Sequence, residues 1–170
     1  LELCLAKFID QETGALAENF LEGWEIERQN DLFIYEPGHL CEWSWLMGGY
    51  QEITGEELMP TRQRLFQLSE STGKDPTRKS LYDQMWSDLS PKLKSSRFWP
   101  QCERVKAASQ LGLAKAAHEG MAALFRYFDL PVRGLWFDTW EENGNFREQP
   151  VKSSSLYHII GAISEYQRLV

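Results

Sequence analysis

The sequence predicts a mainly α-helical protein, with small β-hairpins in the loops that connect the helices. The chain has 170 residues, of which 42% are hydrophobic, and it includes 7 Trp, 6 Tyr and 9 Phe. This is enough apolar material for a folded core. Apolar residues recur at helical spacing in several segments, whereas strand-like alternation is confined to short stretches beside turn signals. We therefore expect residues 1–170 to form a single globular unit.

Six segments have the periodicity and the end signals of helices. The expected helices cover about residues 1–9, 39–53, 56–72, 100–110, 113–128 and 154–169. Pro60 is compatible only with the first turn of the third helix. In the fifth helix, Leu113, Leu124 and Phe128 recur at helical spacing among charged residues. This pattern predicts an amphipathic helix that packs against the rest of the protein.

Three longer connections separate these helices. Residues 31–35 alternate as a strand does, and Asn143-Gly144 within residues 134–147 is a strong hairpin turn signal. Residues 73–98 contain two prolines among many charged residues. We expect a long irregular loop there, and loops of this length in a compact domain often carry function.

The composition excludes several classes of partner. Eighteen Lys and Arg against 25 Asp and Glu give a net charge of −7, which argues against nucleic acid or an anionic membrane as a partner. Three cysteines without C-x-x-C spacing predict neither a disulfide framework nor a zinc ribbon, and they favour the reducing cytoplasm. No signal peptide or membrane-length apolar run is present. Because the first residue is Leu1, we expect the chain to be incomplete at its N-terminus.

The first candidate site residue is His39, which follows the helix-breaking pair Pro37-Gly38. It begins a helix on which His39 and Glu42 share one face. The positive end of the helix dipole disfavours imidazolium, so we expect a neutral His39 that can accept a proton. Glu42 is expected to orient this ring or to bind a sugar hydroxyl. The alternative is that His39 only caps the helix while Glu42 pairs with an arginine.

The second candidate is His158, which follows Ser153, Ser154 and Ser155. Serine is a favoured N-cap residue, so His158 is expected in or just beyond the first turn of the last helix. Its electrostatic environment would then resemble that of His39. The alternative is a hydrogen-bonded histidine of the core. No Gly-x-Ser-x-Gly pattern accompanies the serines, which argues against a serine hydrolase.

The third candidate group surrounds the start of the fourth helix. Pro100 suits the first helical position, which places Arg97 and Trp99 just before the helix and Glu103 one turn inside it. A guanidinium offers paired donors to sugar hydroxyls, and an indole offers a flat apolar face to sugar C–H groups. The alternative is a buried tryptophan with a structural Arg–Glu pair.

These three groups open the second, fourth and sixth expected helices. If successive helices run antiparallel, the three starts lie at the same end of the protein. This end of the protein would then hold two histidines together with carboxylates, an arginine and tryptophans. Such a combination predicts an acid/base site for a carbohydrate. A metal site is disfavoured, because His39 and Glu42 have no third His or Cys placed with them. His118 lies in mid-helix among charged residues and is expected on the surface.

Taken together, these motifs are similar to those of a known family. The matching segments are Glu12 to Glu18 with Trp24, Glu36 to Leu46, Arg97 to Glu103, Gly134 to Asp138 and Ser154 to His158. Over these segments, nearly end to end, the chain resembles the N-acylglucosamine 2-epimerase family of sugar epimerases and aldose–ketose isomerases. The order of Pro-Gly-His-x-x-Glu-Trp, Trp-Pro-Gln-x-Glu and a late Tyr-His makes the combination specific.

The resemblance implies an (α/α)6 barrel, a closed ring of paired helices of which this chain would form the C-terminal half. Inner helices would begin at His39, Pro100 and about Ser154, in agreement with the antiparallel argument. The missing N-terminal half, or a second copy in a homodimer, would cover the exposed inner helices. Without it, we expect the 170-residue chain to be weakly active or inactive.

The resemblance also implies a reaction. His39 and His158 would be the catalytic acid/base pair that moves a proton between C1 and C2, or at C2, of a sugar through an enediolate-like intermediate. No metal and no redox cofactor is implied. The residues expected to bind or support the substrate are Glu42, Arg97, Trp99 and Glu103.

The expected substrate is mannose, N-acetylmannosamine or a related free or phosphorylated monosaccharide. Two other functions stay open on the sequence alone. One is a glycoside hydrolase on a similar helical barrel, which would need two carboxylates across a glycosidic bond. The other is a non-catalytic carbohydrate-binding fragment.

Overall fold

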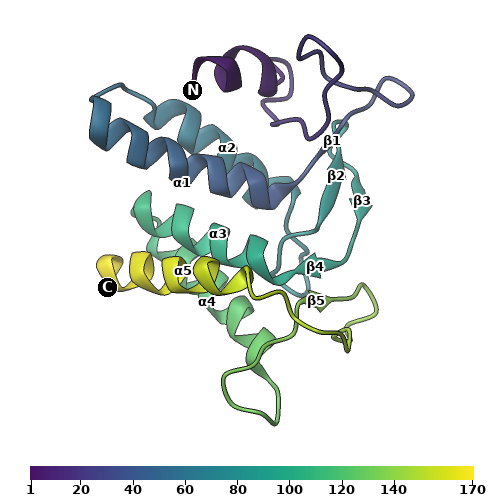
Figure 1. The fold of residues 1–170 in the computed structure, drawn as a ribbon, viewed down its shortest axis with the longest axis vertical. Coiled ribbons are helices and arrows are strands. Elements are labelled where there is room, and N and C mark those ends of the chain that lie inside the picture. The colour runs from purple at the N-terminus through teal and green to yellow at the C-terminus, as the bar shows by residue number, and fades with distance from the viewer.

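The computed structural model describes all 170 residues as two layers of helices with small sheets at one end (Figure 1). The inner layer consists of α1 (Pro37–Thr54), α3 (Phe98–Gln110) and α5 (Ser155–Leu169). The outer layer consists of α2 (Met59–Thr72), which packs on α1, and α4 (Ala114–Phe125), which packs on α3. Two shorter helical segments are η1 (Cys4–Phe8) and η2 (Arg126–Phe128). The predicted mainly α-helical class is confirmed.

The three inner helices run in the same direction, because α2 and α4 each return the chain to the starting end (Figure 1). Their N-termini therefore lie together, as the antiparallel argument predicted. The observed helix bounds agree with the expected ones within a few residues. The largest difference is at the N-terminus, where η1 covers less than the expected helix over residues 1–9.

Local sequence signals explain the ends of these helices. Pro37 occupies the first turn of α1, where its missing N–H breaks no hydrogen bond. The same helix ends at Gly55, which adopts the left-handed conformation with φ of 76° and donates its N–H to the Gln51 carbonyl. At the start of α5, Ser154 holds the N-cap position, but its side chain makes no capping hydrogen bond. The expected serine cap is therefore absent.

The predicted long irregular loop over residues 73–98 is wrong in part, because it contains three short strands. A three-stranded antiparallel sheet has the order β1-β2-β3. Its members are β1 (Ile34–Tyr35), β2 (Gln84–Trp86) and β3 (Pro91–Leu93). Strand β1 pairs with β2 about 50 residues further along the chain, and a local pattern carries no signal for such a distant pairing.

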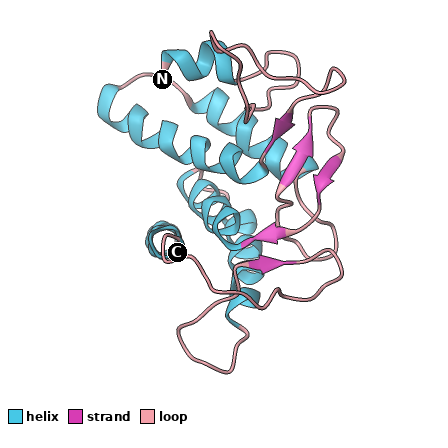
Figure 2. Cartoon of the chain, turned by 45° about the vertical axis from the view of Figure 1, so that its right-hand side comes forward, coloured by secondary structure: helices cyan, strands magenta, loops and turns pink.

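A second sheet joins β4 (Ser96–Arg97) to β5 (Thr139–Trp140), and β4 leads directly into α3. The predicted turn at Asn143-Gly144 is present, since Gly144 has φ of 86° and donates its N–H to the Glu141 carbonyl. Figure 2 shows both sheets at the end where the inner helices begin. The strands thus form the rim on which the helix starts are held.

The core consists of three apolar clusters. The first cluster lies between the N-terminal segment, α1, α2 and the three-stranded sheet, and the second joins α3, α4 and α5. The third lies between the helix pair α1–α2 and the helix pair α3–α4. The cysteines Cys4, Cys41 and Cys102 are buried and free. None of the helices combines the length and the apolar composition that crossing a bilayer requires.

Candidate functional site

The starts of the three inner helices bring three aromatic rings together. The centroid of the Trp99 indole lies 4.9 Å from that of the His39 ring and 5.5 Å from that of the His158 ring. His39 comes from α1, Trp99 from α3 and His158 from α5. Residues spread over 120 positions of the sequence therefore meet because parallel helices begin at one end.

A pocket of about 230 Å³ lies at this place. It contains four of the six residues that the sequence analysis singled out, namely His39, Glu42, Trp99 and His158. The remaining lining residues are Lys152, Ser154, Ser155 and Tyr157. The pocket thus combines imidazole, carboxylate, hydroxyl, ammonium and indole groups, which is the chemistry that recognises and reacts with a polyol.

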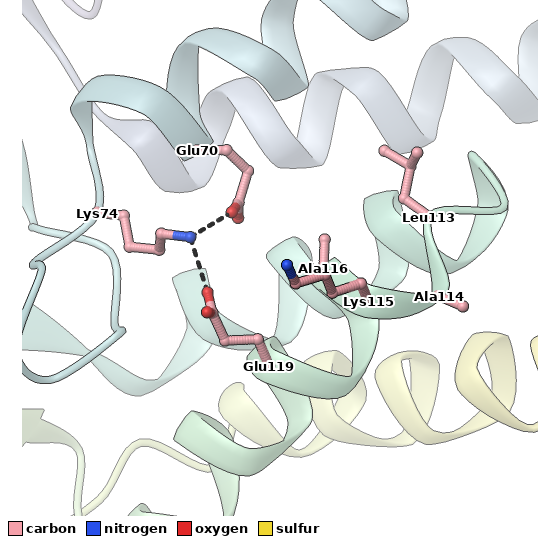
Figure 3. A pocket seen from close by; sticks show the side chains of 7 residues that line it. All are labelled: Glu70, Lys74, Leu113, Ala114, Lys115, Ala116 and Glu119. Atoms are coloured by element: carbon pink, nitrogen blue, oxygen red, sulfur yellow. Dashed lines mark hydrogen bonds and ion pairs between the residues drawn. The ribbon is translucent and has the colours of Figure 1, made fainter.

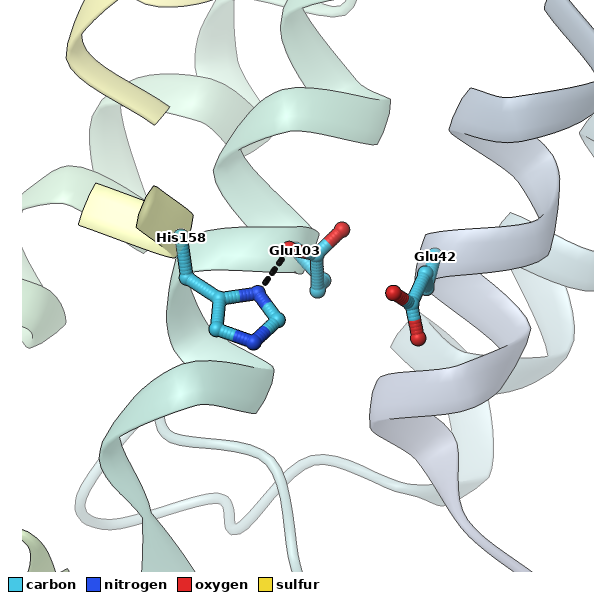
Figure 4. Close-up of side chains that lie close together, drawn as sticks. All are labelled: Glu42, Glu103 and His158. Atoms are coloured by element: carbon cyan, nitrogen blue, oxygen red, sulfur yellow. Dashed lines mark hydrogen bonds and ion pairs between the residues drawn. The ribbon is translucent and has the colours of Figure 1, made fainter. Parts of the chain in front are cut away.

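His158 is held by a buried chain of charges. Its Nδ1 lies 2.6 Å from Oε1 of Glu103, as Figure 4 shows. Glu103 is completely buried and accepts hydrogen bonds from Nζ of Lys106 at 2.9 and 2.8 Å. That ammonium lies 3.5 Å from the ring centroid of Trp45. Glu103 therefore contacts His158 from beneath the pocket and does not line it. With Nδ1–H donated to the carboxylate, the free lone pair of a neutral His158 is on Nε2.

His39 has a carboxylate partner that the sequence analysis missed. Its Nδ1 lies 2.9 Å from both oxygens of Glu18, which also accepts the backbone N–H of Glu36. Burial lowers the pKa of His39, but the hydrogen bond to Glu18 and the negative charges of Glu18, Glu36 and Glu42 together raise it above its usual 6.5. The pKa of His39 therefore shifts upward and not in the direction that the helix dipole favours, because nearby full charges outweigh the dipole.

Glu42 lines the pocket without a hydrogen-bond or ion-pair partner in the chain. It does not hold the His39 ring, which is the role of Glu18. Burial and the negative charge of Glu103 raise the pKa of the Glu42 carboxyl. Figure 4 shows this carboxyl group on α1, across from Glu103 and His158. It is thus available to hydrogen-bond a ligand.

Arg97 lies outside this pocket. It donates from Nη2 to Glu36 at 2.6 Å and from Nε to Asp83 at 3.1 Å, and its guanidinium carbon is 5.4 Å from the Trp99 ring centroid. The alternative of a structural Arg–Glu pair is observed for Arg97, whose glutamate partner is Glu36. These contacts fix the rim between β4 and the start of α1.

A metal ion at this site would have to compete with protein groups that already bind the Glu103 carboxylate. Glu42, Glu103 and His158 offer ligand atoms within 4.8 Å of one another. However, Lys106 and His158 already occupy the oxygens of Glu103, and a metal would have to displace an ammonium buried in the same place. We assign no metal to this group.

Another pocket, of about 460 Å³, lies between α2 and α4 (Figure 3). Lys74 bridges Glu70 and Glu119 there at 2.8 and 2.7 Å. Fully buried Arg104 also pairs with both glutamates. The charged groups neutralise one another and join the two outer helices, so we interpret this region as structural. His118, on α4, is exposed as predicted.

Five residues that line the pocket or hold its histidines escaped the sequence analysis as site residues, namely Glu18, Lys152, Ser154, Ser155 and Tyr157. Glu18 belongs to a matching segment, but nothing in a local pattern places it against a histidine 21 residues later. Lys152 lies in a loop before α5, and only the fold brings it to the mouth. The sequence signal that marks the position of Lys152 is the adjoining run of three serines.

Comparison with known proteins identifies the group to which this fold and site belong. The model of the N-acylglucosamine 2-epimerase (GlcNAc 2-epimerase) family matches residues 1–162. The chain belongs to this family. A protein of Rhizobium meliloti (strain 1021) named mannose-6-phosphate isomerase is 36% identical over 176 residues, which cover 97% of this chain and 46% of that protein.

Solved structures of the same kind share the fold. A D-mannose isomerase has a TM-score of 0.85 at 19% identity, over 99% of this chain and 48% of its own. Cellobiose 2-epimerase from Bacillus thermoamylovorans B4167 has a TM-score of 0.78 at 14% identity, over 96% of this chain and 46% of its own. The chain thus spans about half the length of these family relatives.

Proposed function

We propose that the protein is a sugar isomerase or epimerase that moves a proton at C1 or C2 of a monosaccharide. The observation that carries the proposal is the presence in one pocket of two imidazoles, each held at Nδ1 by a carboxylate and each with its ring centroid within 5.5 Å of that of Trp99. An imidazole is suited to take up and return such a proton.

The two histidines have different tasks in this proposal. His158 takes the proton from C2 of the open-chain sugar through Nε2, and the electron pair passes to the carbonyl oxygen to form an enediolate. His39, whose pKa is raised by three carboxylates, donates a proton to that oxygen. For the ketose, His158 returns the carbon-bound proton to C1, and His39 takes back a proton from the C2 hydroxyl, whose oxygen becomes the new carbonyl. For the epimer, His39 instead gives its proton to the opposite face of C2, and the C1 carbonyl forms again.

The other residues of the site support this reaction. The Trp99 indole packs against the sugar, and Glu42 hydrogen-bonds a hydroxyl. Glu103 positions His158 from below, and Arg97 acts indirectly, by holding Glu36 near His39. Mannose, its 6-phosphate and N-acetylmannosamine are the first substrates to test, because a relative is named mannose-6-phosphate isomerase and a structural neighbour D-mannose isomerase.

We further propose that the chain is the C-terminal half of an (α/α)6 barrel and acts in the cytoplasm. The supporting observations are the parallel inner helices and the half-length match to relatives. The exposed apolar faces of α1 and α5 also favour this architecture. The other half of the barrel, or a second copy of the chain, would cover them. The companion half would complete the pocket and increase the rate.

A glycoside hydrolase has less support from the geometry. Inverting or retaining hydrolysis needs two carboxyl groups free to face the glycosidic bond. Glu42 is free, but Glu103 is buried and neutralised by Lys106 and His158. A non-catalytic sugar-binding role would need no carboxylate behind each histidine.

The test is proton NMR in D₂O with mannose, fructose and N-acetylmannosamine. We expect loss of the C2 signal, or the C1 signal for the ketose, in the presence of the protein. Replacement His158→Ala should lower the exchange rate by about 10²–10⁴-fold, and the matched variant His118→Ala, at an exposed histidine, should not change it. Exchange that persists in His158→Ala would contradict the mechanism. If neither the chain nor one extended by the missing half exchanges the proton, the binding role replaces the enzymatic one.

A further inference from the structure

We propose that the start of α5 binds the phosphate group of a phosphorylated sugar, with Lys152, Ser154 and Ser155 as its ligands. This inference rests on the proposed function, since it assigns the substrate class of the same pocket. Phosphate is an acceptor-rich dianion near neutral pH, and it needs positive charge and several hydrogen-bond donors.

Lys152 supplies the positive charge. It is the only lysine or arginine among the residues that line the pocket, and its ammonium group forms no ion pair within the chain. The two other cations near the site are committed elsewhere, since Arg97 pairs with Glu36 and Asp83 while Lys106 pairs with Glu103. Lys152 is thus the one free cation at the mouth.

Ser155 supplies a donor that the fold itself leaves unused. The residue is only 3% exposed and lines the pocket, yet its hydroxyl makes no hydrogen bond to any protein atom. Its oxygen is not among the fully buried polar atoms without a partner, so it opens on the pocket, where a ligand oxygen can accept its hydrogen bond. The neighbouring Ser154 also lines the pocket and does not use its side chain as a helix cap.

The dipole of helix α5 adds a positive electrostatic potential at the start of the helix. Helix α5 has 15 residues, and no acidic side chain lies in its first turn to neutralise the positive end of its dipole. Phosphate groups bind readily at such helix starts when side-chain donors are also present. The dipole therefore acts in the same direction as Lys152 and the serine hydroxyls.

The position of these groups defines which sugar phosphates fit. Ser154 precedes His158 by one helical turn, about 5.4 Å along the axis, a length on the scale of one sugar ring. A sugar whose C1 and C2 lie at the histidines would extend its far end toward Lys152. The pocket therefore fits an aldose phosphorylated at the end remote from its carbonyl, such as a hexose 6-phosphate.

The test compares the binding of mannose 6-phosphate, mannose and inorganic phosphate by two-dimensional NMR titration of the protein. We expect mannose 6-phosphate to bind at least about tenfold more tightly than mannose, as one charge-assisted contact would provide. In Lys152→Met this ratio should fall toward one. The matched variant Lys115→Met, at an exposed lysine in the pocket between α2 and α4, should keep the ratio.

Ser155→Ala separates a binding role from a structural one. This variant should weaken the binding of mannose 6-phosphate without lowering the melting temperature, because it removes a hydroxyl that the folded chain does not satisfy. A lower melting temperature with unchanged binding would overturn the assignment of Ser155.

Three results would overturn the proposal as a whole. They are equal affinity for mannose and its 6-phosphate, no binding of the 6-phosphate, and a preference that survives in Lys152→Met. Deuterium exchange keeps this proposal distinct from the proposed function. Binding that depends on Lys152 without exchange would refute only the reaction, and exchange without preference for the phosphate would refute only the phosphate site.

Discussion

The Nδ1 atom of His158 lies 2.6 Å from the Glu103 carboxylate, 55 residues earlier in the chain. This contact fixes which nitrogen of the ring is free, because Glu103 is buried and held on both oxygens by Lys106. The same arrangement recurs at His39 with Glu18. Each histidine of the pocket is thus oriented by an acid that lies behind it.

Glu103→Gln should therefore impair His158 without removing it. The neutral amide can present its N–H to Nδ1, which would favour the other tautomer and withdraw the lone pair from Nε2. We expect the proton-exchange rate to fall about 10²-fold and the ¹⁵N shifts of His158 to report the tautomer change. Glu148→Gln, at an exposed glutamate, is the control. An unchanged tautomer in Glu103→Gln would show that the carboxylate does not orient the ring.

Glu18→Gln should lower the pKa of His39. Burial lowers this pKa, and the hydrogen bond and charge of Glu18 are the main influences that raise it, so their loss leaves burial dominant. In the wild type, the charged ring contributes stability below its unfolded pKa of about 6.5, and this stability is lost as the pH rises through the raised folded pKa. NMR titration of His39 measures the shift. Glu22→Gln, at an exposed glutamate in the same segment, should leave the pKa unchanged, and an unaltered pKa in Glu18→Gln would contradict the prediction.

Gly38→Ala should separate the starts of α1 and α3. A Cβ atom at Gly38 would lie 2.7 Å from Cβ of Pro100, whose rigid ring cannot rotate away, and 3.1 Å from the Trp99 indole. We expect a destabilisation of about 1–3 kcal/mol and a reduced exchange rate. Gly49→Ala on the same helix meets no atom within 4 Å and should stabilise the protein by about 0.5–1 kcal/mol. Thermal denaturation of the pair measures both effects, and equal melting temperatures would argue against a tight contact at Gly38.

Glu119→Gln should reduce the loss of the free energy of unfolding as the pH falls into the acid range. The hydrogen bond from Lys74 is the largest influence on the pKa of Glu119. Burial opposes it, but the hydrogen bond and charge of Arg104 act with Lys74, and the pKa is lowered to about 2. Stability from this ionised group is present above its ordinary pKa of 4.5 and is lost as the pH falls toward about 2. Urea denaturation between these pH values measures the effect. The control Glu57→Gln, at an exposed glutamate, should retain the wild-type slope, and a wild-type slope in Glu119→Gln would refute the prediction.

The sequence by itself determined the helices and the place of the site. Apolar periodicity and the signals at Pro37 and Pro60 are local, so they predict where helices begin. The alternation of helix direction then brought His39, Trp99 and His158 to one mouth, as the structure shows. These inferences succeeded because each depends on neighbours within a few turns of the chain.

Only the tertiary structure decided which groups contact one another within that site. Glu18 rather than Glu42 holds His39, Glu36 is the glutamate that pairs with Arg97, and Lys152 reaches the pocket from a loop. The strands hidden in the 73–98 segment likewise pair with partners far away in the sequence. Charges and hydrogen bonds between distant segments depend on distances in space of a few ångström, and no periodicity along the chain encodes them.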